Sequence, residues 1–228
     1  MKTLFVTMFL IASQFLLAQF AIVNDTDGFV NVREEASANS RIVTQLKNNT
    51  IIPTFDYKTD SKSNWTLIEF TPDKSGYVYG IRIQHIHQFK SIQPKKILSS
   101  SVEFDFSDYH ISIITQKFYS NKHKISKKDS FVYAIDGNEF LGTDGNIPQT
   151  EFKTFKITFK GKEILLPKNT FQNLYNAGVS DFKLTYNSKL NQYYLFGTFS
   201  DGAAVYDALW VLENGKLVNH FAQINAYV

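Results

Sequence analysis

The stretch "DTDGFVNVREEASANSRIVTQL", residues 25–46, decides the fold expected of the N-terminal part of the chain. An Asp-Gly turn precedes the alternating run 29–33, a polar loop follows, and a second apolar run begins at Ile42. Alternation of apolar and polar residues between turn residues is typical of short β-strands. The stretch therefore predicts two strands and a loop at the start of a small β domain.

Three further runs continue the pattern: "TIIPTFDY" (50–57), "NWTLIEF" (64–70) and "GYVYGIRI" (76–83). Five short apolar runs separated by turn residues predict a small β-barrel. Pro53 lies within the third run. Because proline cannot donate a backbone hydrogen bond, it must occupy an edge strand, a bulge or a bend.

In their order and spacing, these runs resemble the bacterial Src-homology-3 (SH3b) domain of exported and cell-envelope proteins. The matching residues are Asp27 to Arg33, the polar loop Ser37 to Ser40, Ile42-Val43 with Leu46, Asn64-Trp65, Gly76-Tyr77-Val78 and Arg82-Ile83. The resemblance covers residues 22–85, and it departs from the family at Glu34-Glu35-Ala36, where a turn containing Gly or Pro is usual. It implies an SH3-like barrel that is non-catalytic and binds peptidoglycan peptides or other envelope ligands.

The residues themselves suggest how such a barrel binds a ligand. A shallow groove with aromatic faces and a few charges suits a short peptide. The candidate ligand-binding residues are Arg33, Glu34, Tyr57, Trp65 and Tyr79. The alternative is that Trp65 and the neighbouring Tyr77 are core residues of a very small barrel.

The extreme N-terminus predicts export. Lys2 precedes an apolar run from Leu4 to Leu17, and Ala18 follows. This pattern is typical of a secretory signal peptide over residues 1–18, cleaved after Ala18, since the run is short for a bilayer span. The alternative is an uncleaved membrane anchor or a buried helix. We expect a periplasmic or extracellular protein without a membrane span after signal removal.

Composition excludes several functional classes. The chain has no cysteine, so disulfides, cysteine-ligated zinc and thiol nucleophiles are excluded. Its formal charge of +3 falls to +2 when Lys2 leaves with the signal, which does not favour a nucleic-acid partner. No cofactor is expected. About 210 residues remain after the signal, enough for two modest domains.

Residues 86–98 predict the linker between two domains, because they show little regular pattern and contain Pro94 next to two lysines. His85 and His87 lie at the start of this region, two residues apart, a spacing that on a strand places both imidazoles on one face. A metal site would need a third ligand from elsewhere, and none is evident nearby. We therefore expect no metal.

Residues 99–228 predict a second antiparallel β-rich domain. Val102, Phe104 and Phe106 alternate, Phe155, Ile157 and Phe159 do so before a Lys160-Gly161 turn, and residues 192–224 form a meander with turns at Asp201-Gly202 and Asn214-Gly215. One short helix is predicted over residues 169–178, with Asn169 or Thr170 as its cap and Gly178 after its end.

This second domain resembles an uncharacterised C-terminal region of exported Bacteroidetes proteins. The residues that carry the resemblance are Gly142 to Gly145, Glu163 to Pro167, Asn173-Leu174-Tyr175, Ser200 to Ala203 and Trp210. It implies an exported protein and no particular activity.

Two other features of this domain allow a functional and a structural interpretation. The Asp-Gly steps at Asp136, Asp144 and Asp201 offer carboxylates for glycoside hydrolysis or for calcium binding, but Asp-Gly is also the ordinary residue pair of a β-turn.

The segment 117–128, "KFYSNKHKISKK", has five lysines and no acid. It suits an anionic polymer or lipid surface, or simply a solvated hairpin end.

Three functions follow, in order of preference. The first is an exported, non-catalytic binding protein whose SH3b module holds a cell-wall peptide or an envelope protein. The second is an inhibitor or immunity-type protein against a toxin or a cell-wall hydrolase. The third is a glycoside hydrolase-like enzyme that uses the Asp-Gly carboxylates. No Ser-His-Asp spacing, HExxH motif or phosphate loop supports an enzyme.

Overall fold

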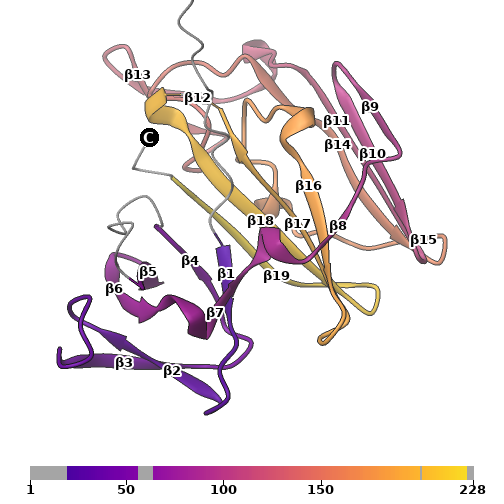
Figure 1. The fold of residues 1–228 in the computed structure, drawn as a ribbon. Helices are drawn as coiled ribbons and strands as arrows, with labels where there is room; N and C mark the ends of the chain where they lie inside the picture. Colours follow the sequence, from indigo (N-terminus) through magenta and orange to yellow (C-terminus); the bar gives the residue numbers. More distant parts are fainter. Residues whose placement is uncertain (1–19, 56–63, 201, 225–228) are drawn as a thin grey trace, which may run out of the picture.

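The computed structural model describes residues 20–55, 64–200 and 202–224 (Figure 1). The described part of the chain is mainly β: 56% of its residues are in strands and 9% are helical, and no helix there reaches seven residues. All pairs of strands in the described ranges are antiparallel, as the fold class predicted. Within the same ranges no helix is long and apolar enough to span a membrane.

The N-terminal unit, residues 20–55 and 64–85, consists of two small sheets. Its strands are β1 (Phe20–Val23), β2 (Phe29–Arg33), β3 (Ile42–Lys47), β4 (Ile51–Pro53), β5 (Trp65–Thr71), β6 (Lys74–Tyr79) and β7 (Ile83–His85), with the 3-10 turn η2 (Gly80–Arg82). The sheet orders are β4-β1-β7 and β3-β2-β6-β5. Both sheets bury apolar residues in one cluster, which includes Val23, Val30, Ile52 and Val78. The described strands form two sheets connected by an isolated bridge between Thr54 and Ile68, so the closed SH3-like barrel stays a prediction.

Strand β1 is absent from the runs that the sequence predicted. It is nevertheless the central strand of its sheet, and Phe20 to Val23 are at most 2% exposed. The unit therefore includes Phe20 and Ala21, which lie before the predicted start at residue 22. Pro53 lies opposite Phe20 on the edge strand β4, one of the positions that its missing N–H allows.

The C-terminal unit is a sandwich of two five-stranded sheets with a small hairpin beside it. One sheet has the order β15-β14-β11-β10-β9, from Lys162–Glu163, Thr150–Phe159, Tyr109–Lys117, Ser101–Phe106 and Lys96–Leu98. The other has the order β19-β18-β17-β16-β8, from Lys216–Ile224, Tyr206–Glu213, Gln192–Phe199, Lys183–Asn187 and Lys90–Ile92. The hairpin pairs β12 (Ile125–Lys128) with β13 (Phe131–Ile135), and the 3-10 turns are η3 (Ile86–Gln88), η4 (Ser120–Lys122), η5 (Lys168–Thr170), η6 (Val179–Asp181) and η7 (Gly202–Ala204).

Strand β18 is buried on both faces. Trp210 and Leu212 point into the sandwich core, whereas Leu209 and Val211 join a second cluster that also contains Phe20 of β1. All four β18 residues are at most 1% exposed, which explains why this strand is apolar at successive positions instead of alternating. The sheet of β18 is thus the middle layer between the sandwich core and the N-terminal unit (Figure 1).

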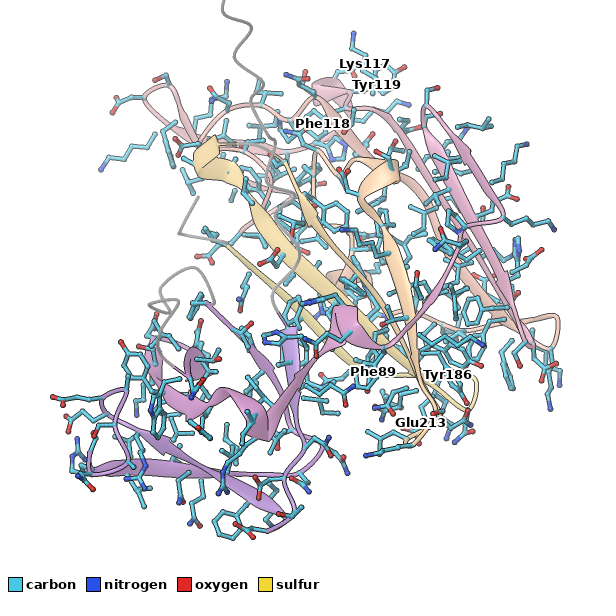
Figure 2. The ribbon with its side chains drawn as sticks, in the orientation of Figure 1. Phe89, Lys117, Phe118, Tyr119, Tyr186 and Glu213 are labelled. Carbon is cyan, nitrogen blue, oxygen red and sulfur yellow. The ribbon has the colours of Figure 1, made fainter. Side chains whose placement is uncertain are left out.

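Aromatic side chains hold the two units together. Phe20 of the N-terminal unit and Phe221 of the middle sheet have ring centroids 5.9 Å apart, and Phe89, in the segment that connects the units, stacks on Tyr194 at 5.5 Å. Figure 2 shows Phe89 at the junction between the N-terminal unit and the middle sheet. An apolar contact of this kind favours one fixed arrangement of the units over relative motion.

The predicted tight turns at Asn214-Gly215 and Lys160-Gly161 are confirmed, whereas the one at Asp201-Gly202 includes a residue outside the described ranges. Asn214 and Gly215 have φ of 47° and 75°, and Lys160 and Gly161 have 50° and 73°, the left-handed values that a type I′ hairpin requires. The alternation of Val102, Phe104 and Phe106 is also seen, with the first two at most 1% exposed and Phe106 packed against the core.

The expected linker, residues 86–98, is not an irregular connection. Strand β8 pairs with β16, and strand β9 pairs with β10. Pro94 lies between these two short strands, so the chain crosses from one sheet of the sandwich to the other and covers an edge of each. Edge strands carry unpaired backbone groups, and their pairing outweighs the weak local pattern.

The helix predicted over residues 169–178 does not form. Only the 3-10 turn Lys168–Thr170 is helical, and the Thr170 hydroxyl donates to the carbonyl of Pro167 at 2.7 Å. The following residues make a parallel bridge between Leu174 and Leu141. These long-range backbone hydrogen bonds replace the helical ones, so tertiary pairing overrides the apolar spacing.

Candidate functional site

A groove of about 420 Å³ lies on the outer side of the N-terminal unit. We call it the Arg33 groove. It is lined by residues of β2, β5, β6, η2 and the adjoining loops: Asp27, Phe29, Val30, Asn31, Arg33, Ala38, Trp65, Tyr79 and Arg82. Three of the five predicted binding residues, Arg33, Trp65 and Tyr79, are therefore brought together.

Strand geometry explains how the groove is built. Phe29, Asn31 and Arg33 alternate along β2, so their side chains share one face, while Val32 is fully buried on the other. Trp65 and Tyr79 lie directly opposite each other on β5 and β6. Phe29 and Asn31 were not among the predicted binding residues, although their spacing of four and two positions from Arg33 is the signal that identifies them.

The two aromatic residues of the groove, Trp65 and Tyr79, are half-buried and do not belong to the buried core. The rings of Trp65 and Tyr79 meet edge to face, with centroids 5.4 Å apart and an interplanar angle of 63°. Both residues and Tyr77 have intermediate exposure, and Tyr77 does not line the groove. Aromatic residues held in this way offer a rigid apolar surface at little entropic cost.

The two arginines of the groove differ in how far neighbouring acids compensate their charge. Arg82 lies 3.1 Å from a carboxylate oxygen of Asp25 and 3.2 Å from one of Asp27, so two acids compensate its charge. Arg33 donates from Nη1 to the Ser40 carbonyl at 2.5 Å and makes no ion pair with an acid of the described residues. Arg33 is therefore the cation best placed to bind a ligand carboxylate.

Glu34 and Tyr57 stand apart from this arrangement. Glu34 accepts two hydrogen bonds from Arg41, at 3.1 and 3.0 Å, and the hydrogen bond and charge of Arg41 lower the pKa of the Glu34 carboxyl. This pairing across the loop holds Glu34 outside the groove lining. Tyr57 lies outside the described residues.

Comparisons with protein-family models, with curated proteins and with solved structures find no match. The resemblance to SH3b domains therefore stays a prediction from the sequence.

The Asp-Gly carboxylates do not share a cavity in the described part of the chain. Asp136 binds Nδ1 of His123 at 2.7 Å, and this hydrogen bond, with that of the Lys124 N–H, lowers the pKa of Asp136. Asp144 is exposed and lines a different cavity from Asp136, and Asp201 is outside the described ranges. Asp136 and its glycine adopt φ of 52° and 81°, the conformation of a tight turn.

No arrangement of three or more metal-ligating His, Asp or Glu side chains occurs among the residues placed by the structure. The rings of His85 and His87 stack at 5.3 Å, so the two imidazoles do share a face as their spacing predicted.

The lysine-rich segment 117–128 runs from the end of β11 through η4 and forms β12, the first strand of the β12–β13 hairpin. Lys117 and Tyr119 point outward, whereas Phe118 is 5% exposed and packs in a small satellite core (Figure 2). Lys127 and Lys128 are exposed at the hairpin end, and Lys122 lies over the Tyr119 ring at 5.0 Å. This geometry is that of a solvated hairpin end. The exposed lysines also form a basic surface that is an alternative to the Arg33 groove for binding an anionic partner.

Proposed function

We propose that this chain is an exported, non-catalytic binding protein whose N-terminal unit holds a short peptide of the cell envelope. The observation that carries the proposal is the meeting of Arg33, Trp65 and Tyr79 in one groove. Arg33 pairs with a carboxylate of the ligand, and the two aromatic rings cover its apolar portion. The signal-peptide pattern of residues 1–18 supports export to the envelope.

Binding to purified cell-wall sacculi tests the proposal. At low salt, the Arg33→Ala and Tyr79→Ala variants should each lose about 1 to 2 kcal/mol of binding free energy, or about 5- to 30-fold in affinity. Their melting temperatures should change little, since neither side chain belongs to the buried core.

Two matched variants serve as controls. Arg41→Ala removes an arginine from the same loop that does not line the groove, and Tyr119→Ala removes an exposed tyrosine from the lysine-rich segment. Both should bind as the wild type does. Equal binding by the wild type and both groove variants would refute the proposal. Loss of binding in Tyr119→Ala alone would assign the surface to the lysine-rich segment.

A further inference from the structure

A second cavity, of about 610 Å³, lies along the outer edge of β19, between the two units. Residues 220–223, which follow one another in β19, all line it. Successive side chains of a strand point to opposite faces of the sheet, so a single space that touches all of them lies at the edge of the strand. β19 is the last strand of its sheet, and no other strand of the described residues pairs with this edge. We call the cavity the β19 edge groove.

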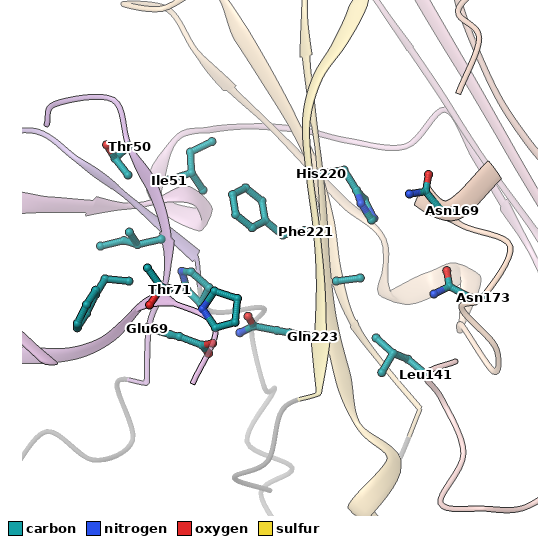
Figure 3. A pocket seen from close by; sticks show the side chains of 15 residues that line it. Thr50, Ile51, Glu69, Thr71, Leu141, Asn169, Asn173, His220, Phe221 and Gln223 are labelled. Carbon is teal, nitrogen blue, oxygen red and sulfur yellow. The ribbon is translucent and has the colours of Figure 1, made fainter. Parts of the chain in front are cut away.

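A wall lies on each side of this edge. Figure 3 shows Phe221 and His220 on opposite sides of β19. The wall beside Phe221 belongs to the N-terminal unit and includes Ile51 of β4. The wall beside His220 includes Leu141 and Asn169 of the C-terminal unit. The edge is therefore recessed. Because two recessed edges cannot reach each other, the groove does not suit pairing with a second copy of this chain, whereas a separate extended segment can enter it.

The recessed edge presents backbone hydrogen-bonding groups. In an antiparallel strand the N–H and C=O of one residue point to the same side, and successive residues alternate between the two sides. The His220 N–H donates to Oδ1 of Asn219 at 2.8 Å, so it points away from β18. The same alternation directs the N–H and C=O of Ala222 outward. Asn219 thus caps the edge at His220, but no side chain of the described residues caps it at Ala222. Uncapped edge groups of this kind are a template for another strand.

The two walls define which side chains an added strand can carry. Its side chains alternate between the walls. Those that point toward Phe221 meet Ile51 and Phe70, so apolar side chains are favoured there. Those on the other side meet the exposed amide of Asn169, which suits small polar side chains. Glu69 is the only acid of the lining, and no lysine or arginine accompanies it, so the charge of the groove is complementary to a basic side chain.

We propose that the β19 edge groove binds an extended peptide, which adds to β19 as a strand through the backbone of Ala222. Pairing along residues 220–224 takes about five residues of the peptide, with alternating apolar and polar side chains and a basic residue near Glu69. The inference does not depend on peptide binding in the Arg33 groove, because the two sites share no lining residue.

Two-dimensional NMR of the full mature chain tests the proposal. The probes are two acetylated and amidated peptides of about five residues, in which valine and threonine alternate and lysine is either first or last. At millimolar concentration one of them should shift the Ala222 amide signal saturably and slow its exchange with solvent. The Phe221 N–H, which points toward β18, should keep its exchange rate. The Trp65 indole of the Arg33 groove should not shift.

N-methylation of alternate residues of the peptide provides a matched control for the backbone contact, because it blocks one edge of the peptide and keeps its side chains. Of the two possible methylation patterns, only the one that places methyl groups toward β19 should bind about tenfold more weakly than the parent peptide. The other pattern should bind as the parent does. This comparison uses the wild-type chain, so it holds whether or not a variant folds.

Two variants test the protein side of the same contact. Ala222→Pro should weaken binding by about tenfold, and proline is tolerated on an edge strand where the N–H faces outward, so its thermal melt should show a folded protein. Glu69→Gln should weaken binding of the lysine peptides by about threefold. Glu163→Gln, at an exposed acid of β15 outside the groove, should bind normally.

Four results would overturn the proposal. Neither peptide shifts the Ala222 amide saturably, both methylation patterns bind equally, or a folded Ala222→Pro variant binds as the wild type does. The fourth is an Ala222 amide that is already protected from exchange without peptide, since the edge would then be covered by the chain itself or by a second copy. A shift of the Trp65 indole without one of Ala222 would place the peptide in the Arg33 groove instead.

Discussion

Truncation of Leu209 to alanine should weaken both units of the protein at once. Leu209 is fully buried on the face of β18 that meets Phe20, and the cluster around it includes Ile86 and Tyr194. Leucine-to-alanine changes at such positions cost about 2 to 5 kcal/mol, depending on how far the surroundings collapse. Because the surroundings come from two layers that can partly close, we expect about 3 kcal/mol, or a fall in Tm of roughly 6 to 12 °C.

The two tryptophans of the chain allow the units to be followed separately. Trp65 lies in the N-terminal unit and Trp210 in the sandwich core. With 5-fluorotryptophan incorporated, ¹⁹F NMR in increasing urea should show both native signals disappearing at the same concentration in the wild type. In Leu209→Ala both signals should disappear at a lower concentration, since the apolar contact couples the units.

The control is Leu165→Ala, at a leucine that is 88% exposed and should change stability by less than about 0.5 kcal/mol. The reasoning would be refuted if the Trp65 and Trp210 signals of the wild type disappeared at different urea concentrations. It would also be refuted if Leu209→Ala moved only the Trp210 signal. Either result would mean that the N-terminal unit folds independently of the sandwich.

Three further predictions concern pH, backbone conformation and processing. Burial lowers the pKa of His220 from 6.5 to about 4 in the folded protein. As pH falls, His220 is therefore protonated at a higher pH in the unfolded chain than in the folded one, so stability is lost between pH 6.5 and 4. After discounting for partial exposure the loss is about 1 to 2 kcal/mol, and urea unfolding of His220→Gln should lack it. Gly142→Ala should cost about 3 kcal/mol, because its φ is +101° and the new Cβ would lie 2.1 Å from the Tyr175 oxygen. Gly28→Ala, at φ +83° with open space, should cost about 1 kcal/mol in the same thermal melt, and equal losses would contradict the steric argument. Mass spectrometry of the exported protein should find Gln19 at its N-terminus, and an intact Met1 would contradict the signal peptide.

The sequence by itself determined the features that depend on neighbouring residues. Asn214-Gly215 and Lys160-Gly161 form hairpins because their residues tolerate positive φ, and alternation placed Phe104 and Ile157 in the core. It also selected Arg33, Trp65 and Tyr79, which the fold brings into one groove. The resemblance to SH3b domains includes Arg33 and Trp65 but not Tyr79, which was selected for its aromatic side chain.

Tertiary structure decided the features that depend on partners far along the chain. The segment around Leu174 has helical spacing, but its bridge to Leu141 prevents the helix. Arg41 holds Glu34 outside the groove, a pairing across a loop whose shape the sequence left open.

The junction between the two units belongs wholly to this second class. Phe20 and Phe221 are separated by 201 positions, and no local pattern marks them as neighbours. Their rings meet because the Leu209 face of the β18 sheet packs against the N-terminal unit. Local propensity is set by adjacent residues, whereas the lining of a cavity depends on how complete layers pack.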